Sequence, residues 1–117
     1  IENTIKKFKK LNSNNKIIAS VGPCIGKKSY EVDVNFYKKF ISESKKNNVY
    51  FKKKNSDKKL FNLRKYVSDK LTRQNVRIDH VNHDTFREKI NFFSYRRSQK
   101  LQEKDYGRCI SVISLIS

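Results

Sequence analysis

The chain has 117 residues and a formal net charge of +17, because 28 Lys and Arg oppose 11 Asp and Glu. This length allows one domain at most and is small for a complete enzyme. No apolar run approaches the roughly 20 residues of a membrane-spanning helix, and two cysteines are too few for a disulfide scaffold. We therefore expect a protein of a reducing compartment, the cytoplasm, without a membrane partner.

The first predicted element is a helix that begins inside an apolar stripe. Ile1, Ile5, Phe8 and Leu11 recur at helical spacing, and no capping residue precedes Ile1. The chain also contains no methionine. We therefore expect a piece of a longer protein whose N-terminal half is missing here.

A polar turn at residues 12–15 and a strand at residues 16–21 should follow this helix. Because side chains alternate along a strand, Ile17, Ala19 and Val21 should share its buried face. The strand leads directly into the first notable motif.

That motif is a loop of sequence Gly-Pro-Cys-Ile-Gly at residues 22–26. Its glycines permit backbone conformations that other residues avoid, so the loop either presents N–H groups to an anion or is an ordinary tight turn. It lacks the spacing of a dinucleotide fingerprint or a P-loop. Cys24 is either a nucleophile or an inert cysteine, since no partner in the sequence would activate its thiol.

A helix is predicted at residues 33–44. Asp33 suits its N-cap, because a short carboxylate accepts hydrogen bonds from the first free N–H groups of a helix. Tyr37, Phe40 and Ile41 should form its buried face.

The chain then predicts a short strand at residues 49–51, a lysine-rich loop at 52–59 and a second helix at 60–74. Asn75 stands where a left-handed residue should end that helix, because asparagine is the common substitute for glycine there. A strand is predicted at 76–81.

The second notable motif is Asn-Phe-Phe-Ser-Tyr-Arg-Arg at residues 91–97. As a strand, it would place Ser94 and Arg96 on one face and Arg97 on the other. One guanidinium would then be held by the protein while the other contacts a phosphate or a base. Solvated arginines at a strand end are the ordinary alternative. The apolar tail at residues 110–116 predicts a buried strand.

These motifs together resemble the laccase-domain family, also called the multicopper polyphenol oxidase family, whose members are described as purine nucleoside phosphorylases. The loop at 22–26 with Tyr-Glu-Val at 30–32 resembles the family signature Gly-Pro-x-Ile-Gly…Tyr-Glu-Val. Residues 92–97 match its Phe-Phe-Ser-Tyr-Arg-Arg motif, and Gly-Arg at 107–108 with the apolar tail matches its closing strand. Asp84-Thr85 replaces the family's usual Cys-Thr.

The resemblance implies an α/β fold, a layered α-β-β-α sandwich with a mixed sheet. Residues 1–117 would be the C-terminal part of a single domain. The full-length protein would cleave purine nucleosides (adenosine, inosine and methylthioadenosine) with phosphate, and would also deaminate adenosine. Its partners would be nucleoside, phosphate and the missing half of the domain.

Substrate contacts carried over from the resemblance are Cys24 and Ile25 at the pocket wall, Ser94, and either Arg96 or Arg97. No catalytic residue is assigned. Two alternatives stay open. One is an inactive fragment with an uncovered apolar face. The other is a basic RNA-binding module, in which aromatic residues of the second motif would imitate a stacking platform.

The family binds one metal, usually zinc and otherwise copper, through two histidines and a cysteine. None of these ligands has a counterpart in this chain, so we expect the metal in the full-length protein and no metal site here. His80, His83 and Cys109 lack the spacing of a zinc site and are interpreted as structural or surface residues.

Overall fold

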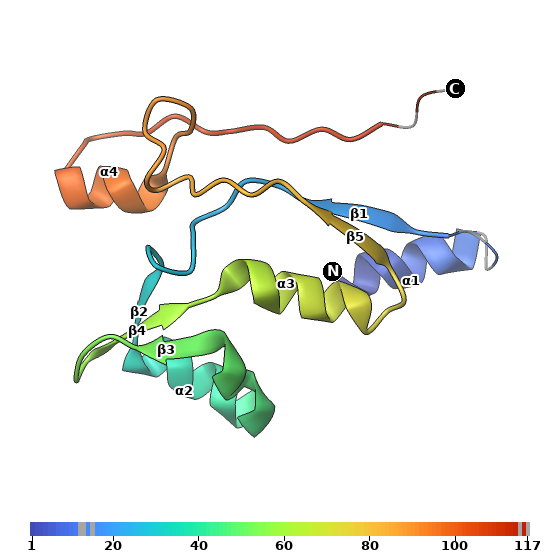
Figure 1. Cartoon of the computed structure of the whole chain (residues 1–117), viewed down its shortest axis with the longest axis horizontal. Coiled ribbons are helices and arrows are strands. Elements are labelled where there is room, and N and C mark those ends of the chain that lie inside the picture. The colour runs from blue at the N-terminus through green and yellow to red at the C-terminus, as the bar shows by residue number, and fades with distance from the viewer. Residues whose placement is uncertain (12–13, 15, 115, 117) are drawn as a thin grey trace.

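The fold is mixed α/β, as predicted. A computed structural model describes residues 1–11, 14, 16–114 and 116 (Figure 1). Its elements, in chain order, are α1 (Glu2–Leu11), β1 (Ile18–Val21), β2 (Glu31–Asp33), α2 (Val34–Glu43), the 3₁₀ helix η1 (Lys45–Tyr50), β3 (Phe51–Lys53), β4 (Lys58–Phe61), α3 (Leu63–Thr72), β5 (Arg77–His80) and α4 (Tyr95–Leu101). Parallel and antiparallel pairing are both present, in two separate small sheets.

The parallel sheet consists of β1 and β5, which pair from Ile18–Arg77 to Val21–His80. Alternation along β1 is as predicted, because Val21 is buried and Ile18 is 58% exposed. α3 runs along this pair in Figure 1, and the buried aliphatic cluster between α1, α3 and the pair consists of Ile5, Val21, Leu71 and Val76. Asn75 has φ of 58°, which confirms the predicted left-handed turn between α3 and β5.

The helix predicted at the start of the chain is present as α1, and most of its apolar stripe is exposed. Only Ile5 is buried, whereas Phe8 is 53% and Leu11 82% exposed. α1 contributes Ile5 to the aliphatic cluster. No other described part of the chain buries the rest of its apolar stripe. The predicted turn at residues 12–15 lies outside the described residues except for Asn14.

The antiparallel sheet has the strand order β2-β4-β3 and packs against α2. Asp33 caps α2 as predicted, since its Oδ1 accepts a hydrogen bond from the Phe36 amide at 2.7 Å. The aromatic cluster is built on three buried residues with six partly buried ones around them: Val32, Tyr50, Phe61, Tyr30, Phe36, Phe40, Phe51, Leu63 and Tyr66.

Two side chains of α2 differ from the predicted buried face. Phe36 joins Phe40 in the aromatic cluster, with their rings stacked at 4.8 Å. Tyr37 lies at its edge, where its hydroxyl donates to Asn48 Oδ1 at 3.0 Å. A phenol that requires a polar partner is better placed at the rim than a phenyl ring.

Residues 45–61 also differ from prediction. The expected strand at 49–51 is η1 followed by β3, and the expected loop at 52–59 contains the β3–β4 hairpin. The helix begins at Leu63 rather than at 60, because Asn62 Oδ1 accepts the Lys65 amide at 3.1 Å and so caps it.

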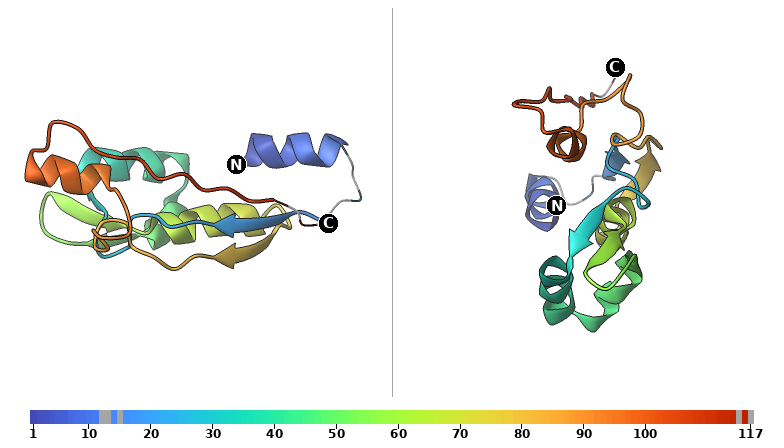
Figure 2. Two further views of the ribbon diagram at one scale, coloured as in Figure 1. Left: turned by 90° about the horizontal axis from the view of Figure 1, so that it is seen from above. Right: turned by 90° about the vertical axis from the view of Figure 1, so that its left-hand side faces the viewer.

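The C-terminal third differs most. The expected strand at 91–97 is absent: Ser94 is an N-cap and α4 begins at Tyr95. Residues 110–114 and 116 of the tail do not form the expected buried strand either, because no described strand pairs with them, and Ile110 and Ile116 are 89% and 97% exposed. Figure 2 shows the segment after α4 as an extended trace running back past β1.

Candidate functional site

The glycine loop at 22–26 leaves β1 and is fixed against residues 84–85. Cys24 forms an isolated parallel bridge with Asp84, and the Thr85 amide donates to the Cys24 carbonyl at 3.2 Å. The Gly26 carbonyl accepts from the amides of Ser29 and Tyr30 at 2.9 and 3.0 Å. The loop is thus a hydrogen-bonded turn that brings Cys24 and Asp84 to one place.

Gly26 is required there because Asp84 lies against it. A Cβ atom at Gly26 would lie 2.7 Å from Asp84 Cγ, closer than real side chains approach. The Asp84 carboxylate accepts from the Ser29 hydroxyl at 2.6 Å and from the Phe86 amide at 3.0 Å. Burial raises the pKa of Asp84, but hydrogen bonds from Ser29 and from the backbone of Gly26, Phe86 and Arg87 outweigh it, so the pKa lies below its ordinary value.

Asp84 was missed as a site residue from the sequence, where it was noted only as a departure from the family pattern. A recognisable signal exists, because an Asp that accepts the amide two residues later forms an Asx turn. Its contact with Ser29 spans 55 residues and is set by the tertiary fold.

Three of the five guanidinium N–H groups of Arg97 donate to backbone carbonyls. Its Nη1 donates to the carbonyls of Thr85 and Phe86 at 2.7 and 3.0 Å, and its Nη2 donates to the carbonyl of Phe92 at 2.5 Å. Three carbonyl acceptors around one guanidinium hold residues 85–92 against α4. The fork geometry of arginine suits this role, which an ammonium cannot reproduce.

Arg96 has a different environment. Its guanidinium carbon lies 5.5 Å from the centroid of the Tyr30 ring, a cation–π distance. Because Arg96 and Arg97 lie on a helix, they diverge by about 100° rather than pointing to opposite faces of a strand.

Ser94 and the residues of the glycine loop occupy separate places. Ser94 caps α4, accepting from the Arg97 amide at 3.4 Å, and lines a cleft of about 640 Å³ with Arg97. Cys24 lines another cleft, of about 670 Å³, beside Pro23. Ile25 is half-buried in the loop. Of the five predicted substrate contacts, Ser94 and Arg97 therefore share one cleft and Cys24 lines another.

Metal-ligating side chains do not gather in the described part of the chain. Among residues 1–11, 14, 16–114 and 116, no three His, Cys, Asp or Glu side chains lie close enough to hold a metal ion. His83 Nδ1 lies 2.7 Å from Glu88 Oε2, and the Cys109 sulfur lies 3.9 Å from the Phe93 carbonyl. These residues do not fit a metal held by two histidines and a cysteine.

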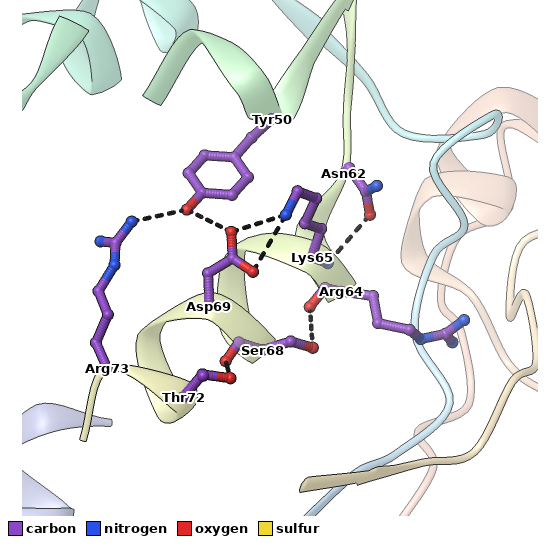
Figure 3. Close-up of polar contacts among 8 residues, drawn as sticks. All are labelled: Tyr50, Asn62, Arg64, Lys65, Ser68, Asp69, Thr72 and Arg73. Carbon is purple, nitrogen blue, oxygen red and sulfur yellow. Dashed lines mark hydrogen bonds and ion pairs between the residues drawn. The ribbon is translucent and has the colours of Figure 1, made fainter. Parts of the chain in front are cut away.

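A polar network joins η1 to α3 (Figure 3). The Tyr50 hydroxyl donates to Asp69 Oδ2 at 2.9 Å and accepts from Arg73 Nη2 at 3.3 Å, while Lys65 pairs with Asp69. Burial, together with the Asp69 carboxylate, raises the pKa of Tyr50. Arg64 extends away from this network, and its Nη atoms donate to oxygens of residues 81–83.

Comparison with known proteins assigns the chain to a family. A family model described as multi-copper polyphenol oxidoreductase laccase matches residues 1–116. The chain belongs to this family. The predicted resemblance is thereby confirmed.

Similar proteins include purine nucleoside phosphorylases of two bacteria. The chain is 33% identical to one from Rickettsia conorii over 115 residues and 34% identical to one from Haemophilus influenzae over 116 residues. Each alignment covers 97% of this chain but only 48% and 45% of the relative. The chain thus spans about half the length of the curated relatives it matches.

A solved structure has the same fold. The crystal structure of the Bacillus licheniformis hypothetical protein YfiH matches with a TM-score of 0.73 at 20% identity, covering 83% of this chain and 39% of that one. Within the described residues, no helix combines the length and the apolar character needed to cross a membrane.

Proposed function

We propose that the chain is the C-terminal part of one laccase-type domain, residues 1–117, and that the whole protein cleaves purine nucleosides with phosphate. The names of the two relatives support this reaction, and their greater length supports a larger functional unit. Adenosine and inosine are the proposed substrates, with methylthioadenosine cleavage and adenosine deamination as further activities. Zinc or copper would be bound by residues outside this chain.

Within this function, Arg96 is the proposed substrate contact and Arg97 a positioning residue. The observation that carries the choice is that three backbone carbonyls accept hydrogen bonds from the Arg97 guanidinium. These contacts commit Arg97 to holding residues 85–92 against α4. Among the contacts of the described residues, the Arg96 guanidinium contacts only the Tyr30 ring. The guanidinium is therefore able to donate hydrogen bonds to a phosphate or a purine edge.

Cys24, Ile25 and Ser94 take supporting places in the proposal. Cys24 and Ile25 belong to the turn that is fixed by residues 84–85, so they would shape the wall next to Tyr30 and Arg96. Ser94 fixes the start of α4 and hence the direction in which Arg96 leaves it. The RNA-binding alternative is left with two of its three aromatic residues, because the Phe92 ring packs against the His83 ring at 5.4 Å while Phe93 and Tyr95 are 58% and 56% exposed.

The test compares alanine variants of the two arginines in the longest natural protein that contains this chain. Arg96→Ala should lower kcat/KM for adenosine or inosine phosphorolysis by at least ~100-fold, equal to about 3 kcal/mol for a charge-assisted contact, with unchanged unfolding. Arg97→Ala should instead lower the free energy of unfolding by about 1–3 kcal/mol, because three carbonyls lose their donor. Arg96→Lys should recover little activity.

Arg108 offers a matched control, since its guanidinium carbon also lies over a tyrosine ring, 4.7 Å from the Tyr106 centroid. Arg108→Ala should keep near-normal turnover. If Arg96→Ala also keeps it, Arg96 does not contact substrate and the proposed site is wrong. If the unchanged protein releases no free purine in a phosphate-dependent manner, the proposed reaction itself is wrong.

A further inference from the structure

A basic cleft lies between the glycine loop, the start of α3 and the end of β5, next to the Cys24 cleft, with which it shares Arg64. It has a volume of about 590 Å³, within the range of small-molecule sites. Five cationic side chains and one carboxylate are prominent in its lining: Lys27, Lys28, Arg64, Lys65, Arg87 and Asp84.

Arg64 contributes a positive charge that no carboxylate balances among the contacts of the described residues. Its Nη1 donates to Asn82 Oδ1 at 2.7 Å, and its Nη2 donates to the carbonyls of Val81 and His83 at 3.2 and 2.9 Å. These partners are neutral, and its buried Nε has none. Neutral oxygens fix the guanidinium in place and leave its charge available to attract an anion.

The single carboxylate of the cleft is already occupied. Asp84 accepts from the Ser29 hydroxyl and the Phe86 amide, and the Arg87 Nε lies 3.9 Å from its Oδ2. Lys65 is balanced by Asp69 outside the cleft. Lys27 and Lys28, both exposed, therefore join Arg64 as charges without a balancing carboxylate among the described contacts.

The backbone reinforces this charge. α3 has ten residues and its N-terminus opens on the cleft, where Asn62 and the first-turn residues Arg64 and Lys65 are part of the lining. A helix N-terminus carries partial positive charge, which adds to the cationic side chains and attracts anions.

We propose that this cleft binds an organic phosphate, whose phosphate group is held by Lys27, Lys28 and Arg64 and whose organic part occupies the remaining volume. The volume exceeds what a single phosphate ion fills, and doubly charged phosphate oxygens match adjacent lysines with a fixed guanidinium. The proposal depends on this cleft alone and does not require phosphorolysis.

The test measures binding of ribose 5-phosphate to the 117-residue chain by isothermal titration calorimetry at constant ionic strength. Unphosphorylated ribose, inorganic phosphate and a short uridine oligonucleotide are titrated in parallel. Lys27→Ser/Lys28→Ser should raise the Kd for ribose 5-phosphate at least ~10-fold, because two charge-assisted contacts are lost. Ribose should not bind, and inorganic phosphate should bind more weakly than the ester.

The matched control is Lys38→Ser/Lys39→Ser, which makes the same charge change at two exposed positions of α2. Its Kd should stay within ~2-fold of the unchanged chain, since screened charges outside the cleft contribute little. Arg87→Gln provides a second variant whose side chain is 63% exposed and makes one weak pair, so folding is retained while the Kd rises.

Three outcomes would overturn the proposal. Equal loss in the cleft and control variants would show that net charge alone attracts the ligand. Equal affinity for inorganic phosphate and the ester would show that the organic part is not recognised. Binding of the oligonucleotide alone would show that the cleft is part of an RNA-binding surface.

Discussion

The aromatic cluster and the chain after β5 are stabilised in different ways. In the aromatic cluster, Phe61 and Tyr50 are each 2% exposed and rings from α2, β3 and α3 contact one another at 4.8–6.3 Å. After β5, most large apolar residues are exposed, including Ile90 at 91% and Leu101 at 62%, whereas Phe86 and Phe92 are half-buried. That segment is fixed by polar contacts to carbonyls and carboxylates.

This difference has a physical consequence for local stability. Burial of aromatic area stabilises a region whatever the pH, whereas a segment fixed by few charged hydrogen bonds opens when one of them is lost. We therefore expect the chain after β5 to open before the aromatic cluster, and three experiments test that order.

The largest effect is expected from Phe61→Ala. Phe61 contacts the rings of Tyr30, Phe36, Phe40, Phe51 and Tyr66 from the centre of the aromatic cluster. Its truncation should lower the free energy of unfolding by about 3–5 kcal/mol, because it removes buried area and leaves a cavity. Urea denaturation followed by circular dichroism measures this. A loss below ~1 kcal/mol would mean that the cluster does not carry the stability of the fold.

An intermediate effect is expected from acid, and it should be confined to the chain after β5. The folded pKa of Asp84 lies below its ordinary value of 3.8, so its stabilisation is fully present above that pH and is lost as the pH falls through the folded pKa. Asp84→Asn should remove this acid dependence and weaken the segment by about 1–2 kcal/mol even at neutral pH, since a charged acceptor is lost.

Amide hydrogen exchange of residues 84–98, compared with residues 58–72, measures the acid effect. Asp105→Asn is the control, because Asp105 is exposed and, among the contacts of the described residues, its side chain accepts only the neighbouring Tyr106 amide. Faster exchange in residues 58–72 than in residues 84–98 at low pH would reverse the expected order.

The smallest effect is expected from Ile110→Ser. Ile110 is 89% exposed, so its side chain buries almost nothing on folding of this chain. The free energy of unfolding should change by less than about 0.5 kcal/mol, while self-association at high concentration should fall as an exposed apolar group is removed. Thermal denaturation and analytical ultracentrifugation measure the two quantities. A loss of ~2 kcal/mol would indicate that the tail is buried in solution.

The candidate site could be predicted from the sequence only in part. The two motifs led to the family, which the comparisons confirm, and the glycine loop does lie near the start of α4 through Asp84, Thr85 and Tyr30. The arginines were assigned to opposite faces of a strand, but Ser94 caps a helix there. The alternation of residues 92–97 with a period of two favours a strand. The competing signal is a Ser followed by helix-forming residues, which is typical of an N-cap, and the structure has the helix.

The sequence by itself determined the features that depend on neighbouring residues. Asp33 as a cap, Asn75 in the left-handed region and the inward face of β1 were all predicted, because each depends on the geometry of a few consecutive residues. Only the tertiary structure decided which polar and charged groups lie together. Arg97 finds its carbonyls 5–12 residues away, and Lys27 and Lys28 share a cleft with Arg64 because β2, β4 and α3 fold back onto the loop. Such contacts are set by chain topology, which local patterns do not encode.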